Sequence, residues 1–225
     1  MKDQEASAVE QIAAHIEKHL GRIVNVFADA APEPRATDAT DAPRILVHHV
    51  PATDIRPVHT LITSGISTRA MAVPPNENAP RHIELMMTMP RQWKFDADSL
   101  RQQQWRWPID HLQRLAHIPA ANGTWFAWGQ AIPNGNPPQP LASGTKLCGV
   151  IIAPSLFVPP DFYELHAGSR TVVFFAAIPL YQEELRLRQE QGMEALLAKL
   201  LDHGIQDVID LRRRNIARRK TLGLF

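Results

Sequence analysis

Histidine is the residue type that gives this chain most of its potential for metal chemistry, with ten copies in 225 residues. His15 and His19 stand four residues apart in a helical pattern, so both imidazoles lie on one side of the helix. The residues around them do not form the H-E-x-x-H motif, and no third ligand can be assigned, although a catalytic zinc usually needs three. His48 and His49 are adjacent in a predicted strand and point to opposite faces. We therefore predict no metal site and no cofactor.

Two side chains have the chemistry of a nucleophile, Ser64 and Cys148. The serine lies in "TSGIS", which lacks the leading glycine of a nucleophile elbow and is followed by no helix. The cysteine lies in "KLCGVII", inside a predicted strand, where a thiol is usually an inert small hydrophobe. Neither of the glycine-rich phosphate-binding motifs occurs. We assign no catalytic residue and predict that the protein is not an enzyme.

A hydrolase or metal enzyme remains the alternative prediction. His48, His59, His82 and Glu84 lie in or beside predicted strands. Sequence spacing does not exclude that folding brings such positions together in one site. A clustered arrangement of these histidines with the carboxylate would favour this alternative.

The charge of the chain is unevenly distributed, although its formal net charge is only +1. The run "RRRNIARRK" at residues 212–220 holds six basic residues, and without it 18 basic residues face 23 acidic ones. This balance makes nucleic acid an unlikely partner for the body of the protein. We predict a domain over residues 1–216 and a basic C-terminal tail over residues 217–225. A nucleic-acid-associated regulator that binds through this tail is the second alternative.

The single cysteine and the apolar segments indicate the compartment. One cysteine cannot form an internal disulfide, which fits a reducing environment. The N-terminal residues are acidic where a signal peptide would be apolar, and no apolar run approaches the roughly 20 residues of a spanning helix. We predict a cytoplasmic protein without membrane contact.

Hydrophobic periodicity predicts an α+β fold with a mixed, largely antiparallel central sheet and helices packed against it. A first helix ends at Gly21, and Pro108 is predicted at the start of a helix. A last helix is interrupted at Gly192. Residues 28–43, rich in Ala, Pro, Asp and Thr, read as a flexible exposed loop. Strands are predicted at residues 22–27, 44–50, 58–64, 82–90, 145–154 and 170–181.

The connection that begins "TWFAWGQAIPNGNPPQPLASG" is unusually rich in tryptophan and proline around an Asn-Gly turn. Trp107 and Trp125 are predicted to close the core, as large aromatic side chains usually do. The remainder is predicted to contact a partner, because exposed tryptophans are enriched at binding hot spots and a proline-stiffened loop loses little entropy on docking. The predicted partner-binding residues are Trp128, Gln130, Pro133, Asn134, Gly135, Pro137 and Pro138.

Several motifs, in order along the chain, resemble the suppressor of fused family in its single-domain bacterial form. They are "TLITSGISTRAMAVP", "IELMMTMPRQW", "WPIDHLQRLAHIP" and "TWFAWGQAIPNG", and the likeness extends from about Ile12 to Asn215. Gln130 departs from the pattern, since a histidine is usual there. The motif positions expected to be structural are Thr63, Ser64, Gly65, Met71, Trp107, Pro108, Thr124, Trp125, Gly129 and Gly149.

The resemblance implies a domain without known catalytic activity. Eukaryotic members of the family restrain a transcription factor by binding it, and bacterial members have been proposed as immunity proteins that neutralise toxins. We therefore expect a non-catalytic, cytoplasmic protein–protein binding module of bacterial type. Its partner would be another protein, such as a toxin, held in a stoichiometric complex.

Overall fold

One eight-stranded sheet and three long helices make up the protein in a computed structural model, which describes residues 2–29 and 43–218, with side chains from residue 8 onward. The strands are β1 (Asn25–Ala28), β2 (Leu46–Val50), β3 (Val58–Ser64), β4 (His82–Pro90), β5 (Ala131–Pro133), β6 (Leu147–Ala153), β7 (Glu164–Ala167) and β8 (Arg170–Tyr181). The α-helices are α1 (Lys2–Leu20), α2 (Ala97–Leu100), α3 (Gln103–Asn122) and α4 (Gln182–Asp202). Two short 3₁₀ turns are η2 (Ile66–Thr68) and η3 (Pro160–Phe162).

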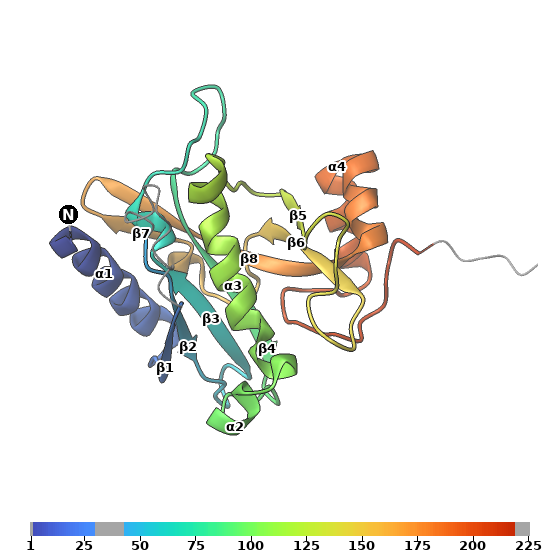
Figure 1. The fold of residues 1–225 in the computed structure, drawn as a ribbon, viewed down its shortest axis with the longest axis horizontal. Helices are drawn as coiled ribbons and strands as arrows, with labels where there is room; N and C mark the ends of the chain where they lie inside the picture. The colour runs from blue at the N-terminus through green and yellow to red at the C-terminus, as the bar shows by residue number, and fades with distance from the viewer. Residues whose placement is uncertain (1, 30–42, 219–225) are drawn as a thin grey trace, which may run out of the picture.

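The sheet is mixed and largely antiparallel, which confirms the predicted fold class. Its strand order is β1-β2-β3-β4-β8-β6-β5, and β7 adds a short antiparallel partner to β8 (Figure 1). Within the described residues, β4 and β8 form the only parallel pair of strands. The long connection between them contains α2, α3 and the proline-rich segment, as a parallel pairing requires.

One face of the sheet is covered by α3 and is apolar. Ile109, Leu112 and Leu115 on this helix are fully buried. They pack against residues such as Leu85 and Val150 from the central strands (Figure 1). Burying side chains of this size contributes about 1.5–3 kcal/mol each, so α3 anchors the main core.

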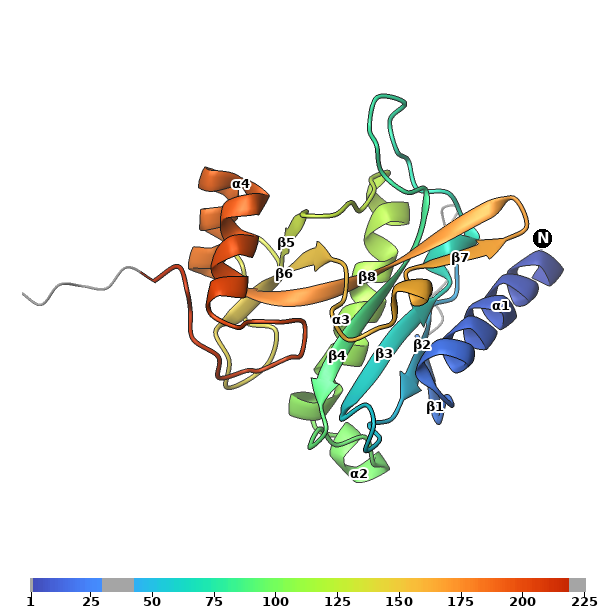
Figure 2. The same cartoon turned by 180° about the vertical axis from the view of Figure 1, so that it is seen from behind.

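The other face is shared by α1 and α4, which lie at opposite ends of the sheet (Figures 1 and 2). Ile12 and Ile16 of α1 pack against Phe162 and Phe174. Leu187, Leu196 and Leu200 of α4 cover Ile151 and Leu180 of the last strands. Each helix buries one apolar stripe against the sheet, as the helical spacing in the sequence predicts.

Glu84 is completely buried beside the end of β3. Its carboxylate accepts hydrogen bonds from Thr63 Oγ1 (2.6 Å), the Gly65 amide (3.0 Å), and the Ser67 amide (3.0 Å) and hydroxyl (2.7 Å). Gly65 has φ 125°, and a Cβ there would lie 2.4 Å from the carbonyl oxygen of Arg44. The motif "TSGIS" therefore forms a tight turn around this carboxylate and is not an open nucleophile elbow.

Glu184, in the first turn of α4, is the second fully buried carboxylate. It pairs with Arg213, whose Nη1 and Nη2 donate to its two oxygens at 2.7 and 2.5 Å. The amides of Tyr181 and Ile216 donate to the same carboxylate at 2.9 and 3.1 Å. Arg213 also donates to the carbonyl of Pro179. This ion pair fastens the segment after α4 to the beginning of that helix.

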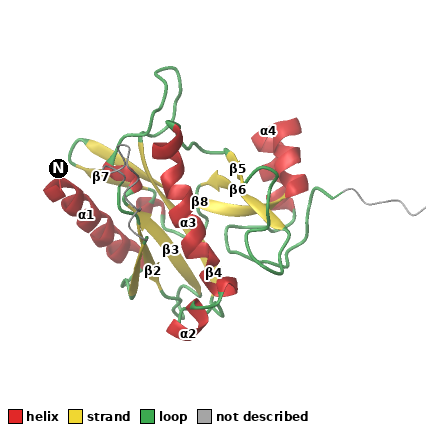
Figure 3. Ribbon diagram, in the orientation of Figure 1, coloured by secondary structure: helices red, strands yellow, loops and turns green. Residues whose placement is uncertain are grey.

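Residues 203–218, here called the C-terminal segment, return across the sheet after α4 (Figure 3). Val208 forms a parallel bridge with Thr88 of β4. Asp207 is buried and accepts hydrogen bonds from Ser155 Oγ (2.5 Å) and the Leu156 amide (3.0 Å). These contacts attach the beginning of the C-terminal segment to β4 and to the residues that follow β6.

The predicted elements are recovered with a few differences. β5 and β7 were not predicted, because each is short and lies among turn-forming residues. Pro108 was predicted at a helix start but lies inside α3, which begins at Gln103. Pro108 lacks the amide that would donate to the Gln104 carbonyl, but Gln104 is exposed, so water can hydrogen-bond to that carbonyl and the helix can begin before the proline.

Two predicted boundaries fall at the limits of the described residues. The predicted loop at 28–43 begins inside the sheet, since Ala28 belongs to β1, and residues 30–42 lie outside the described residues. Of the predicted tail, Ala217 is half-buried and packs against the core beneath α4, and Arg218 is exposed. Residues 219–225 also lie outside the described residues. The division at residue 216 stays a prediction.

Candidate functional site

The tryptophan- and proline-rich connection divides into a buried and an exposed part. Trp107, in the preceding helix α3, is 2% exposed, and Trp125, at the start of the connection, is half-buried against the same core. Phe126 is buried, and its amide donates to Sδ of Met71. Trp128, by contrast, leaves 57% of its surface exposed. The aromatic residues therefore serve the core at the start of the connection and face solvent near β5.

A closed turn follows β5. The side-chain amide of Asn134 donates to the carbonyls of Gln139 (2.8 Å) and Pro140 (3.1 Å), while its backbone amide donates to the carbonyl of Cys148 (2.8 Å). Gly135 adopts φ 90°, a conformation that favours glycine. Asn134 thus closes the turn through its side chain and attaches it to β6 through its backbone amide. The prolines project from this closed loop.

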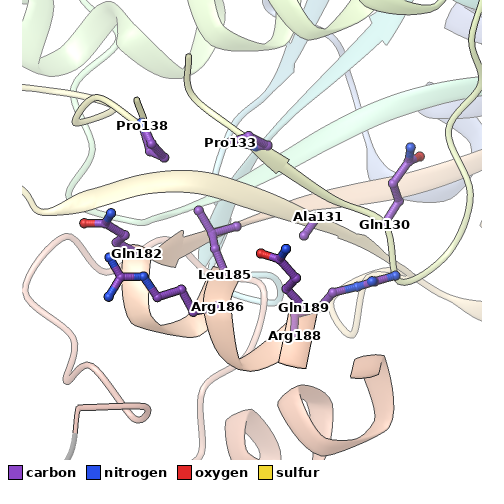
Figure 4. Close-up of a pocket in the computed structure, with 9 residues that line it drawn as sticks. All are labelled: Gln130, Ala131, Pro133, Pro138, Gln182, Leu185, Arg186, Arg188 and Gln189. Carbon is purple, nitrogen blue, oxygen red and sulfur yellow. The ribbon is translucent and has the colours of Figure 1, made fainter. Parts of the chain in front are cut away.

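A pocket of about 410 Å³ lies between this loop, β5 and the first half of α4 (Figure 4). We call it the β5–α4 groove. β5 is the last strand of the sheet, so its outer edge has no strand neighbour among the described residues. The residues that line the groove are Gln130, Ala131, Pro133, Pro138, Gln182, Leu185, Arg186, Arg188 and Gln189.

Three of the seven predicted partner-binding residues, Gln130, Pro133 and Pro138, line this groove. Asn134, Gly135 and Pro137 belong to the adjoining turn and do not line it, and neither does Trp128. These assignments stay predictions, but four of the seven residues belong to the loop after β5, and Gln130 and Pro133 lie beside or within β5 itself.

The groove residues on α4 were missed by sequence reasoning. Leu185 packs directly over Gly149, where an added Cβ would lie 2.9 Å from the leucine Cδ1. Arg188 donates its Nε to the carbonyl of Gly129 (3.0 Å). Gly129 itself adopts φ 79°, and an added Cβ would lie 1.8 Å from Sδ of Met193. Two family-motif glycines therefore let α4 approach the sheet closely. These glycines were the feature of the sequence that could have indicated a helix packed there.

The groove is cationic and amide-rich. Its lining contains two guanidinium groups, Arg186 and Arg188, three glutamine amides, and apolar side chains. None of its nine lining residues is a histidine, cysteine, aspartate or glutamate. Such a surface can bind by hydrogen bonding, ion pairing and apolar contact, and it offers no general base or nucleophile.

The residues of the alternative enzyme prediction do not form an open site. His48 Nε2 lies 2.8 Å from the Ser64 hydroxyl, and burial lowers the pKa of this histidine to about 4. His82 Nδ1 contacts the carbonyl of Ser67 at 2.8 Å, and Ser67 also donates to Glu84. His48 and Glu84 are buried and His82 is half-buried, so these three side chains have the environment of structural groups.

His59 belongs to a separate cluster. Its Nδ1 lies 3.0 Å from His49 Nε2, and its Nε2 lies 3.1 Å from the carbonyl of Arg91. Burial, followed by the charges of His59 and Arg56, lowers the pKa of His49 to about 3. This arrangement favours neutral imidazoles in a hydrogen-bonded chain.

Two absences hold for residues 2–29 and 43–218, the part of the chain that the structure describes. Among those residues, no group of three or more His, Cys, Asp or Glu side chains could hold a metal ion. None of the helices in the same residues combines the length and apolar character of a membrane span. Cys148 is buried in β6, and burial, followed by Glu183 and Glu184, raises the pKa of its thiol.

Comparison with solved structures places this architecture among known folds. A suppressor of fused homologue from Neisseria gonorrhoeae FA 1090 superimposes with a TM-score of 0.67 at 16% identity, covering 96% of this chain and all of that one. The Sufu–Fu complex gives a TM-score of 0.63 at 16% identity, with 93% and 92% coverage. Drosophila Suppressor of Fused gives 0.61 at 14% identity, and this chain, 94% covered, spans 51% of that chain.

Sequence comparison identifies the family. No curated protein sequence matches this chain significantly. The family model described as suppressor of fused protein (SUFU) matches residues 41–214, which is most of the chain and includes β5, α4 and the Glu184–Arg213 pair. The chain therefore belongs to the suppressor of fused family.

Proposed function

We propose that this protein is a non-catalytic binding module. It binds another protein in a stoichiometric complex through the β5–α4 groove and thereby restrains that protein. The observation that carries the proposal is the position of the groove at the free edge of the sheet, bordered by the rigid proline-rich loop. An extended segment of a partner can lie along such an edge, with its side chains in the adjoining hollow.

The composition of the groove supports binding over chemistry. Pro133, Pro138 and Leu185 give it rigid apolar walls, while Gln182 and Gln189 provide both donors and acceptors. Pre-formed walls of this kind lose little entropy when a ligand binds. Trp128, exposed beyond one end of β5, adds an aromatic anchor of the type enriched at hot spots.

The finer assignment is a cytoplasmic, bacterial immunity-type protein that neutralises a toxin or otherwise restrains its partner. It is supported by the family resemblance and by the lack of chemically reactive side chains in the groove. One solved relative is described as the Sufu–Fu complex, so at least one family member is held by another protein. Nucleic acid is a poorer candidate, because Arg213 of the basic run is internally paired with Glu184.

A steric block of the groove tests the proposal. Gln189 is exposed and lines the groove, so Gln189→Trp fills the hollow without disturbing the core. Gln191 is exposed on the other side of the same helix and lines a different hollow, which makes Gln191→Trp a matched control. Partners captured by the wild-type protein in its source organism would be identified and purified. The mass of each complex would then be measured to give its stoichiometry.

We expect a complex of fixed stoichiometry that Gln189→Trp abolishes and Gln191→Trp preserves. When the partner is a toxin, cells that carry Gln189→Trp should lose protection against it, and cells that carry Gln191→Trp should keep normal protection. Equal binding by both tryptophan variants would place the interface elsewhere and reject the proposed groove. Turnover of any substrate by the purified protein would reject the non-catalytic assignment.

A further inference from the structure

The β5–α4 groove differs in charge from the rest of the molecule. It contains two arginines and no acidic lining residue. Outside residues 212–220, however, 18 basic residues face 23 acidic ones in the whole sequence. A cationic hollow in a net acidic body is suited to select a ligand by charge.

Arg186 is available for such a ligand. It is exposed, and its side chain makes no hydrogen bond or ion pair with any other described residue. Glu183, one helical turn before it, instead accepts a hydrogen bond from the Asn215 side chain (2.7 Å). Glu190, one turn after it, lines a second hollow together with Glu183, and Arg186 borders that hollow too but forms no ion pair with either glutamate.

Arg188 is held differently. Its Nε donates to the carbonyl of Gly129, which fixes the start of the guanidinium at the edge of β5. This contact leaves the two terminal nitrogens without a carboxylate partner among the described residues. A planar guanidinium held at one nitrogen is pre-organised to receive a carboxylate.

The two guanidinium groups stand toward opposite ends of the groove. Figure 4 shows Arg186 directed toward Gln182 and the Pro138 loop, while Arg188 extends in the other direction, below Gln130. The apolar side chains of Leu185 and Ala131 lie between them. The order of surfaces along the groove is therefore cationic, apolar, cationic.

We propose that the partner presents an extended acidic peptide segment, in which an apolar residue lies between two Asp or Glu residues. The carboxylates pair with Arg186 and Arg188, and the apolar side chain rests on Leu185 between them. This inference rests on the proposed function and adds the chemistry of the partner. Proline walls and an apolar floor fit a peptide better than a nucleic-acid backbone, which would require only the charges.

A peptide-display selection on the full-length protein tests the inference without a known partner. Random peptides would be selected on the wild-type protein and on Arg186→Glu in parallel. Arg22→Glu is the matched control, because Arg22 is exposed near the β1 edge and carries the same change in net charge. We expect acidic residues flanking an apolar one on wild type and on the control, and a basic residue replacing one acid on Arg186→Glu.

One selected peptide would then be synthesised together with its Asp/Glu→Asn/Gln analogue. The difference between their affinities measures how much the peptide's charges contribute to binding. We expect the analogue to bind wild type at least about tenfold more weakly, and Arg186→Glu to weaken the acidic peptide by a similar factor. Rising salt should weaken the acidic peptide and leave the neutral analogue almost unchanged.

Each alternative outcome has a separate meaning. Peptides that Gln189→Trp blocks but that show no acidic preference would overturn this inference and leave the proposed function standing. Peptides that Gln189→Trp does not block, or no peptides at all, would count against both. Binding of single-stranded DNA that competes with the acidic peptide would replace the peptide with a nucleic acid as the ligand.

Discussion

Glu84 and Glu184 are both completely buried carboxylates, yet the fold satisfies them by different means. Glu84 is surrounded by neutral hydroxyl and amide donors from one turn, residues 63–67. Glu184 is met by the charged Arg213, which lies 29 residues later in the chain. The first arrangement stabilises a local turn, whereas the second joins two distant segments.

The difference has a consequence for proton binding. Burial raises the pKa of Glu84 above its ordinary value, and the hydrogen bonds from Thr63, Ser67 and Gly65 oppose that rise. Neutral donors thus leave this carboxyl easier to protonate than it would be in the unfolded chain. Substitutions at the two sites can show how much each arrangement contributes.

The largest effect is expected for Arg213→Met. This change leaves Glu184 as a buried charge without its cation, because the guanidinium supplies both of its ion-pair contacts. We expect the free energy of unfolding to fall by about 3–5 kcal/mol, as measured by urea denaturation at neutral pH.

The double variant Arg213→Met/Glu184→Leu is the control for this prediction. It removes both charges, so it should recover a large part of the stability lost in the single variant. A single variant that loses less than about 1 kcal/mol would show that Glu184 is solvated or repaired by other groups.

A smaller loss is expected for Glu84→Leu. The amides of Gly65 and Ser67 would lose their acceptor in a closed turn, while the hydroxyls can rotate to other partners. We expect destabilisation of about 3 kcal/mol in the same denaturation assay. Glu84→Gln keeps an acceptor oxygen and should lose only about 1 kcal/mol. Equal losses in the two variants would contradict this assignment of the amides.

The pH dependence of Glu84→Gln tests the direction of the pKa shift. A raised folded-state pKa means that the contribution of Glu84 is fully present below its ordinary value of 4.5 and is lost as pH rises through the folded value. The wild type should therefore lose stability relative to Glu84→Gln as pH rises above 4.5. Denaturation curves of both proteins across this range measure the difference, and a gap that widens in favour of the wild type would reverse the sign.

The smallest effect is expected for an exposed ion pair. Arg91 and Asp54 are 2.7 Å apart, but their side chains are 56% and 92% exposed. We expect Asp54→Asn to cause no measurable loss of stability at moderate salt, since water and ions replace the contact. A loss approaching that of Arg213→Met would mean that burial is not what separates the two ion pairs.

The sheet could be predicted from sequence because its central strands carry long apolar runs. "TKLCGVII" and "RTVVFFAAIPLY" predicted β6 and β8; β6 is buried throughout, and β8 is buried at eight of its twelve residues. The order of the strands could not be predicted, because the parallel pairing of β4 and β8 depends on contacts between residues far apart in the chain. β5 escaped prediction since three residues give no periodic signal.

The candidate site was predicted on one wall only. Proline and the Asn-Gly pair identified the rigid loop, since their backbone preferences are local. The opposite wall depends on α4 packing against Gly129 and Gly149, and nothing in the sequence states which helix approaches which glycine. The sequence alone therefore offered no reason to select Arg186 and Arg188 as site residues.

The pairing of Arg213 with Glu184 also determines when the domain can finish folding during its synthesis. A ribosome adds Arg213 only after it has synthesised all of the described strands and helices. Until then the Glu184 carboxylate has the Tyr181 amide as a donor but lacks the Arg213 guanidinium and the Ile216 amide, so a nascent chain that stops short of this arginine would hold the helix against the sheet poorly.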